Sequence, residues 1–156
     1  MLVTNDQVDE LVLALADLSG LDEELVERCG SLVRTQRYDE AVSRAFVVLE
    51  ERMRALMGMQ GGTGRQLVNK LFSEKGAQYI ERLSLPEQEW KGIRSIFDGA
   101  FAAYRNRAAH TVAGYSLEEA RAIVHLVNLL LLIVGQMRHV PQRHVQPEVA
   151  AALGER

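Results

Sequence analysis

The longest apolar segment of the chain, residues 122–134, constrains the fold most. Only His125 and Asn128 interrupt it. The segment Ser116-Leu117-Glu118-Glu119 comes shortly before it, and a serine followed three residues later by a glutamate is a capping box that starts a helix. Because the run falls short of the ~20 apolar residues that span a membrane, we expect a final helix that is buried on nearly all sides.

The other clear segments of the chain also carry apolar residues at helical spacing. None alternates apolar and polar residues for long enough to predict a strand. The predicted helices cover residues 4–20, 21–36, 38–56, 63–72, 86–101 and 116–137, with Thr63 as the cap of the short fourth one. We therefore expect an all-α protein, an up-and-down helical bundle with an N-terminal helical extension. The expected organisation is a helical hairpin at 1–36, a helical domain at 37–138 and a tail at 139–156.

Composition limits the kinds of partner and site. A chain of 156 residues with 47% hydrophobic and 25% charged residues is typical of one soluble domain. Its net charge of −3 gives no global attraction to nucleic acid, so a polyanion would need a local basic patch. The single cysteine, Cys29, excludes an intramolecular disulfide and a Cys-rich zinc site.

The same sequence predicts a cytoplasmic protein with no membrane segment, no metal and no cofactor. The first six residues lack the basic region and the apolar core of a signal peptide. Two histidines, His139 and His144, fall in the predicted tail, and a metal site built from them would need acidic ligands as well.

The segment Arg105-Asn106-Arg107-Ala108-Ala109-His110 gathers two cations, an amide and an imidazole. Arginine recognises phosphate with a fork of donors, and histidine moves a proton near neutral pH. In RNA, removal of the 2′-hydroxyl proton lets that oxygen attack the adjacent phosphorus, while an acid protonates the departing 5′-oxygen. The segment could supply these parts without a metal, with His110 for proton transfer, Arg105 for the phosphate and Asn106 for orientation.

The spacing within this segment leaves several geometries open. Asn106 and His110 are four residues apart and would share a helix face. Arg105 and His110 are about 140° apart around an ideal helix. They converge only if the arginine bridges the gap, if the helix ends near Ala109, or if Arg105 of one subunit works with His110 of another. The competing interpretation is structural, because an arginine and a histidine near a helix C-terminus commonly stabilise the macrodipole.

Residues 105–110 resemble the Arg-x(4–6)-His signature of the HEPN superfamily, including the asparagine that often follows the arginine. Their place before the last long helix is also similar. The resemblance implies an all-helical, commonly dimeric domain. It further implies metal-independent endoribonuclease activity of the kind found in toxin–antitoxin, abortive-infection and CRISPR systems.

A closer resemblance is to the Ymh-type bacterial and phage proteins within that group, and it covers roughly residues 37–135. Proteins of that type often have proline directly after Arg-Asn, where this chain has Arg107, which adds a cation that could touch RNA. The segments that carry the resemblance are 38–46, 67–72 and 97–104.

Two residues on the third predicted helix, Glu50 and Arg54, resemble the Glu-x3-Lys/Arg pattern of many HEPN proteins. At a spacing of four they predict an ordinary surface bridge. If that helix faces the motif, they could instead orient the catalytic groups. His125 is predicted to be a core histidine.

The resemblance thus implies a homodimeric or higher oligomeric HEPN ribonuclease of antiphage defence or a toxin system. Arg105, Asn106 and His110 are its expected catalytic residues, Arg107 and Tyr104 contact RNA, and Glu50 and Arg54 support the site. The alternative is a non-catalytic helical dimerisation or binding module of such a system. A third possibility is a toxin-type domain silenced by an antitoxin or other partner protein that modifies or masks Tyr104 or the motif.

Overall fold

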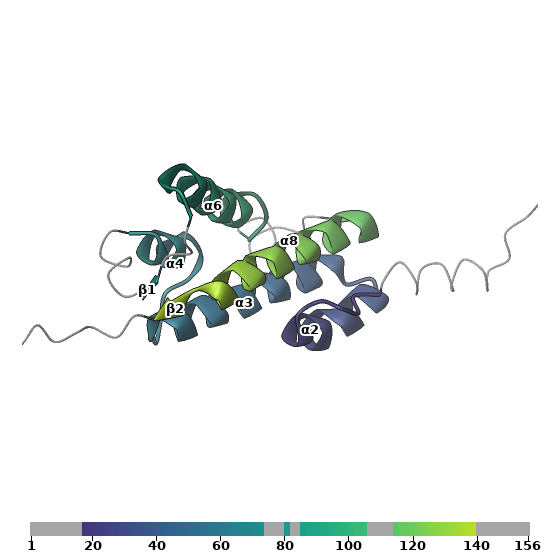
Figure 1. Ribbon diagram of the computed structural model, residues 1–156. Helices are drawn as coiled ribbons and strands as arrows, with labels where there is room; N and C mark the ends of the chain where they lie inside the picture. Colours follow the sequence, from purple (N-terminus) through teal and green to yellow (C-terminus); the bar gives the residue numbers. More distant parts are fainter. Residues whose placement is uncertain (1–16, 74–79, 82–84, 106–113, 140–156) are drawn as a thin grey trace, which may run out of the picture.

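The computed structural model describes residues 17–73, 80–81, 85–105 and 114–139, and these form an all-α helical bundle (Figure 1). The predicted fold class is confirmed. The helices are α2 (Glu23–Arg34), α3 (Tyr38–Met57), α4 (Gly64–Leu71), α6 (Glu87–Ala100), the π-helix η1 (Phe101–Arg105) and α8 (Leu117–Gln136). Most of the first predicted helix, residues 4–20, lies outside the described residues.

The two longest helices, α3 and α8, form the centre of the bundle and run side by side (Figure 1). Helix α2 packs against both of them at one end, while α4, α6 and η1 pack together at the other end. The buried residues of α2 belong to the same apolar core as those of α3. The predicted division of the chain at residue 36 stays a prediction.

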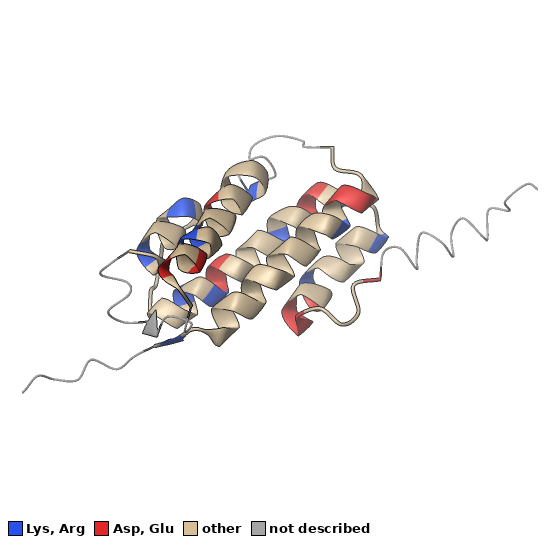
Figure 2. Cartoon of the chain, turned by 45° about the horizontal axis from the view of Figure 1, so that its top comes forward, with Lys and Arg blue, Asp and Glu red and all other residues tan. Residues whose placement is uncertain are grey.

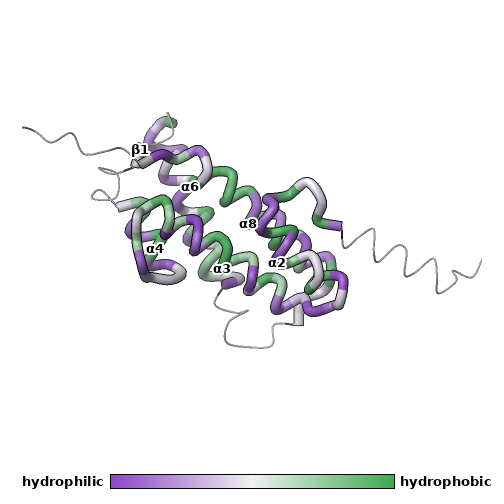
Figure 3. The backbone as a smooth tube through the Cα atoms, turned by 90° about the horizontal axis from the view of Figure 1, so that it is seen from below, coloured by the Kyte–Doolittle hydropathy of each residue, from purple (hydrophilic) through white to green (hydrophobic). Residues whose placement is uncertain are grey.

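Helix α3 supplies much of the core because its apolar residues recur every three or four positions. Figure 3 shows hydrophobic stretches of this helix, in green, separated by hydrophilic ones, in purple. Phe46 meets Phe101 of η1 edge to face, with ring centroids 5.2 Å apart. The predicted inward residues Ala41, Ala45, Val48, Leu49 and Met53 are all buried, and Leu56 is partly buried. One charged side chain on this helix is also buried, that of Glu50.

The predicted N-caps of α8 and α4 have different outcomes in the structure. The capping box of α8 is confirmed, since Ser116 Oγ accepts from Glu119 N at 3.1 Å and Glu119 Oε2 accepts from Ser116 N at 2.8 Å. Thr63 occupies the N-cap position of α4, but its hydroxyl makes no capping bond. The predicted N-cap position is therefore correct but the expected capping bond is absent, and the carboxylate of Glu50 accepts from the first amide of α4 instead.

Two further expectations about α8 are wrong. The helix is not buried on nearly all sides, because Leu129 is 48% exposed and Leu132 is 56% exposed. His125 is exposed and is not a core histidine. The reason is that α8 packs mainly against α3 and α2, which together cover only part of its circumference.

A short sheet also departs from the predicted absence of strands. Strand β1 (Ile80–Glu81) pairs antiparallel with β2 (Arg138–His139), with Ile80 opposite His139. Two-residue strands are too short to show an alternating pattern, so the sequence could not reveal them. His139, predicted to begin the tail, thus lies in a strand, and His144 lies outside the described residues.

Candidate functional site

The residue that begins the Arg-x4-His motif is held by a buried carboxylate of α3. Arg105 Nε donates to Glu50 Oε1 at 3.2 Å. The Glu50 side chain is 3% exposed and the Arg105 side chain is 19% exposed. A buried carboxylate is stable only when it is paired and hydrogen-bonded, so this contact fixes the position of the guanidinium.

The same oxygen of Glu50 also binds the start of α4. Glu50 Oε1 accepts from the backbone N–H of Gly64 at 2.8 Å. One turn further along α3, Arg54 Nη1 donates to the backbone carbonyl of Gly62 at 2.8 Å. The predicted surface bridge between Glu50 and Arg54 is therefore wrong. Glu50 binds Gly64 and Arg105, whereas Arg54 binds Gly62. The Glu50–Arg105 contact brings α3 against the first residue of the motif. A role of Glu50 or Arg54 in orienting catalytic groups stays a prediction.

The local backbone at Arg105 is unusual. Helix α6 passes directly into the π-helix η1, whose last residue is Arg105. A π-helix bonds each N–H to the carbonyl five residues back, and π-turns inside α-helices are frequent at functional sites. The buried ring of Phe101 anchors the start of this turn. The predicted angle between Arg105 and His110 stays a prediction, because residues 106–110 lie outside the described residues.

A second carboxylate of α3 holds the chain beyond the motif. Asp39 Oδ2 accepts from Gly114 N at 3.1 Å, and Asp39 Oδ1 accepts from Tyr115 N at 3.0 Å. Gly114 has a φ of +66°, a conformation that favours glycine. An open cavity of about 220 Å³ lies beside these contacts, between residues 36–40 and this return segment.

Asp39 is the residue that sequence reasoning missed. An aspartate in the first turn of a helix is ordinary, because it interacts favourably with the helix dipole. Its position within the segment 38–46, which carries part of the resemblance, was the one available signal. Glu50 and Asp39 together tie both flanks of residues 106–113 to a single helix.

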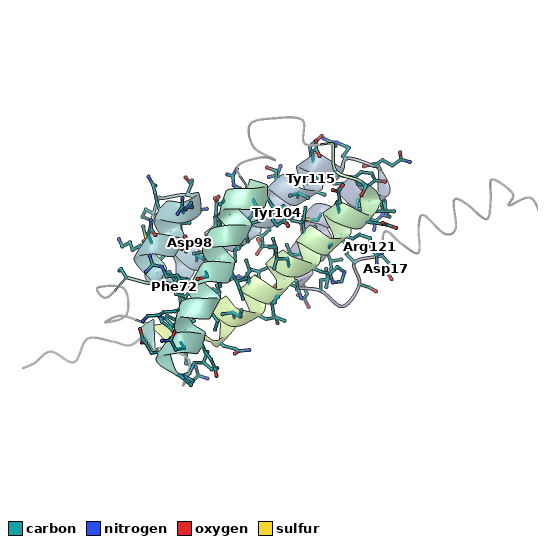
Figure 4. The ribbon with its side chains drawn as sticks, turned by 90° about the horizontal axis from the view of Figure 1, so that it is seen from above. Asp17, Phe72, Asp98, Tyr104, Tyr115 and Arg121 are labelled. Carbon is teal, nitrogen blue, oxygen red and sulfur yellow. The ribbon has the colours of Figure 1, made fainter. Side chains whose placement is uncertain are left out.

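The remaining predicted site residues divide into two groups. Tyr104 is partly buried and packs against the apolar core. In Figure 4 it lies on the same side of the molecule as Tyr115, which precedes α8. The predicted residues Asn106, Arg107 and His110 lie outside the described residues.

Basic residues lie on both α4 and α6 near this region, and α6 carries acidic residues as well (Figure 2). Arg65 of α4 and Arg94 of α6 both lie near Asp98, at 3.7 Å and 3.6 Å. Helix α4 also carries the exposed Lys70 and no acidic residue. Because α4 contacts η1, these cations lie on the elements that surround Arg105.

Two negative findings apply to the part of the chain that the structure describes. No group of three or more His, Cys, Asp or Glu side chains there could hold a metal ion. No helix there is both long enough and apolar enough to cross a membrane.

Comparison with known proteins places the chain in a family. No curated protein and no solved structure matches it. A family model described as "Protein of unknown function (Hypoth_ymh)" matches residues 19–134, which include α2, α3, both carboxylate contacts and nearly all of α8. Since this match spans well over half of the sequence, the chain belongs to the Ymh family.

Proposed function

We propose that this protein is a HEPN-type endoribonuclease that cleaves RNA without a metal ion, in antiphage defence or as a toxin. The observation that carries the proposal is the Glu50–Arg105 contact. A buried carboxylate orients Arg105 through Nε at 3.2 Å, at the residue where the Arg-x4-His motif begins. Orientation through Nε directs one edge of the guanidinium to the protein and leaves the two terminal nitrogens for a phosphate.

The proposed reaction is transfer within the RNA backbone. One His110 imidazole removes the proton of a 2′-hydroxyl, and that oxygen forms a bond to the adjacent phosphorus. The bond from phosphorus to the 5′-oxygen breaks, and the leaving oxygen takes a proton from an acid. Arg105 stabilises the charge on the phosphate, and Asn106 orients one of these groups. The products are a 2′,3′-cyclic phosphate and a 5′-hydroxyl.

Charge considerations favour more than one cation at the scissile phosphate. The charge of Arg105 is offset by Glu50, so their pair attracts an anion less than a lone arginine would. Arg107 would add a cation, and Tyr104 would offer a ring near the RNA. A second copy of the chain would contribute its own pair of motif residues across a two-fold axis.

One observation favours a second candidate, a non-catalytic helical module that binds a partner in a defence or toxin–antitoxin system. Arg105 already has a buried partner in Glu50, as a purely structural arginine would. In this case the arginine and histidine of the motif serve the fold, and RNA remains intact.

Incubation of the purified chain with a long RNA in EDTA separates these candidates. The samples are the wild type, His110→Ala, Arg105→Lys and the control Arg34→Ala, which changes an exposed arginine at the end of α2. We expect fragments with cyclic-phosphate ends from the wild type and the control, and a loss of at least tenfold in both motif variants. Equal cleavage by all four proteins, or none by the wild type, would contradict the proposal. Circular dichroism of each variant verifies that the fold is retained.

A further inference from the structure

The solvent-facing side of α4 consists of side chains that donate hydrogen bonds. The exposed residues of this helix stand at positions 65, 66, 69 and 70, so they share one face, while its apolar residues are buried on the other. Each exposed side chain carries N–H groups, two of the four are cations, and none is acidic or apolar. We call this surface the α4 donor face, and its members are Arg65, Gln66, Asn69 and Lys70.

The sequence around α4 is also free of acidic residues. No aspartate or glutamate lies between Glu51 and Glu74, although the whole chain has 21 acidic residues and a net charge of −3. Other helices expose acidic residues or both signs of charge. Helix α2 exposes Glu23, Glu27 and Arg34, and the first turn of α8 exposes two glutamates. The α4 donor face therefore differs from an ordinary solvated helix face, on which both signs are mixed.

The α4 donor face begins beside the first residue of the Arg-x4-His motif. Glu50 Oε1 accepts from Gly64 N at 2.8 Å and from Arg105 Nε at 3.2 Å. These two donors are therefore neighbours around one oxygen atom, and Arg65 follows Gly64 directly. Helix α4 contacts both η1 and α6 (Figure 1). An anion bound by Arg105 would thus lie at one end of the α4 donor face.

Helix α4 is held firmly enough to present these donors in fixed positions. Leu67, Val68 and Leu71 are fully buried in the core. The loop that precedes the helix is tied to α3, because Arg54 Nη1 donates to the carbonyl of Gly62 at 2.8 Å. Donors on an element that is already ordered lose less conformational entropy when a ligand binds.

Helix α6 adds a third cation to this surface. Arg94 Nη2 donates to Asn69 Oδ1 at 3.4 Å. Arg94 and Arg65 lie 3.6 Å and 3.7 Å from the two oxygens of Asp98. Their side chains are 43% and 60% exposed, and exposed ion pairs of this kind are weak. One carboxylate balances one of the two arginines, so together with Lys70 the surface keeps a positive charge.

We propose that the α4 donor face, extended by Arg94, binds the sugar–phosphate backbone of the RNA strand whose scissile phosphate Arg105 holds. The identity of this ligand rests on the proposed function. Phosphate oxygens only accept hydrogen bonds and carry negative charge, so a positive surface made of donors is complementary to them. A helix of eight residues is about 12 Å long, which allows contact with more than one phosphate.

The composition of the surface favours RNA over a protein partner. Protein interfaces depend on buried aromatic and apolar anchors, and α4 exposes neither kind of residue. The same composition predicts recognition without base preference. Sequence-tolerant stacking and base readout both need side chains that reach the bases, above all aromatic rings. Neither α4 nor α6 exposes an aromatic residue.

Binding of an RNA that cannot be cleaved tests this surface. The probe is a fluorescent single-stranded RNA with 2′-O-methyl groups, which lacks the 2′-hydroxyl nucleophile, and anisotropy measures its affinity at several salt concentrations. We expect Arg65→Gln/Lys70→Gln to bind roughly tenfold more weakly than the wild type at low salt. The slope of log K against log salt should become shallower by about 1.4, because each lost phosphate contact with a single strand contributes about 0.7.

Two control variants accompany this measurement. Arg34→Gln/Arg44→Gln makes the same change in net charge at exposed arginines of α2 and α3, and it should bind within about twofold of the wild type. The exchange Arg65→Lys/Lys70→Arg keeps both charges and should retain most of the affinity. Unchanged affinity of Arg65→Gln/Lys70→Gln, an equal loss in the Arg34/Arg44 control, or a wild type that does not bind the probe would overturn the proposal.

Probes of different sequence test recognition of the backbone. The 2′-O-methyl homopolymers of uridine, adenosine and cytidine should bind the wild type with affinities within about fivefold of one another, since no aromatic ring of α4 or α6 is available for stacking. A preference of more than about tenfold for one homopolymer would show that bases are read and would contradict the proposal.

Cleavage of unmodified RNA separates this inference from the proposed ribonuclease. In an active protein, Arg65→Gln/Lys70→Gln should raise KM and leave kcat nearly unchanged, whereas His110→Ala should lower kcat. Binding through the α4 donor face with no cleavage by the wild type would remove the ribonuclease and keep this surface. Cleavage with an unchanged KM in Arg65→Gln/Lys70→Gln would remove this surface and keep the ribonuclease.

Discussion

The carboxylate of Glu50 lies 3.2 Å from Nε of Arg105 and so joins the middle of α3 to the last residue of η1. Glu50 is nearly inaccessible to solvent, and its oxygen also binds the first amide of α4. Three elements, α3, α4 and η1, thus meet at one oxygen atom. A change at this atom should affect both the stability of the bundle and the position of Arg105.

Substitution of Glu50 by glutamine should destabilise the protein more than the same substitution of its neighbour. The glutamine can still accept from Gly64, but Arg105 would lose its ionic partner and remain largely buried, at a cost of about 3 kcal/mol. Urea unfolding measures this difference. The control is Glu51→Gln, a carboxylate that is 41% exposed and pairs with Arg28, and it should change the free energy of unfolding by less than about 1 kcal/mol. Similar effects from the two substitutions would show that the Glu50–Arg105 contact is unimportant for stability.

Loss of the Asp39 carboxylate should release the chain that follows the motif. Asp39→Ala removes the acceptor for two backbone amides, and we expect a loss of about 1–3 kcal/mol in stability. If the proposed ribonuclease activity is present, kcat should fall because residue 110 is only four residues from Gly114. Glu40→Ala is the matched control, since that exposed carboxylate pairs with Arg37 on the surface. Unchanged amide exchange at Gly114 and Tyr115 in Asp39→Ala would contradict this role.

Burial of the Cys29 thiol should make stability fall in alkaline solution. Burial raises the pKa of Cys29 from 9.0 to about 11. Below pH 9 the thiol is neutral in both states, so its contribution is fully present. Between pH 9 and pH 11 the unfolded chain loses the proton first, and stability falls by as much as about 3 kcal/mol.

Comparison with Cys29→Ala isolates this effect from the titration of lysines and tyrosines. Urea unfolding at several pH values should give a steeper decline for the wild type than for the variant between pH 9 and pH 11. Parallel declines in the two proteins would show that the thiol titrates normally.

The two N-caps provide a paired prediction. Ser116→Ala removes the oxygen that binds Glu119 N and should cost about 1 kcal/mol, with a range of about 0.5–2 kcal/mol. Thr63→Ala removes a hydroxyl that makes no capping bond, so its effect should stay below about 0.5 kcal/mol. Thermal unfolding of both variants measures the difference. A larger loss from Thr63→Ala than from Ser116→Ala would contradict the cap assignments.

Most of the helices could be predicted because their signals are local. The apolar spacing of residues 38–56 predicted α3, and Ser116 with Glu119 predicted the first residue of α8 within one position. Capping and periodicity involve residues within one or two turns of each other, so the sequence displays them directly. The π-turn at Arg105 and the two-residue strands have no such local signal.

The contacts of the candidate site could not be predicted in the same way. A glutamate four residues before an arginine predicts a surface bridge, whereas Glu50 and Arg54 turn to different partners in the fold. Asp39 looks like an ordinary residue of a first helical turn until Gly114 and Tyr115 pack against it. Each of these bonds joins residues that do not share a helix, so no helical spacing rule applies to them.

The sequence by itself determined the all-α class, the main helices and the motif from Arg105 to His110, because helical periodicity, caps and motif spacing are properties of neighbouring residues. The tertiary structure alone decided that a buried oxygen of Glu50 holds Arg105 and that Leu129 and Leu132 of α8 stay half exposed. Both outcomes depend on which helix packs against which. Packing is decided by the burial of surfaces from the whole chain, and no short segment of sequence contains that information.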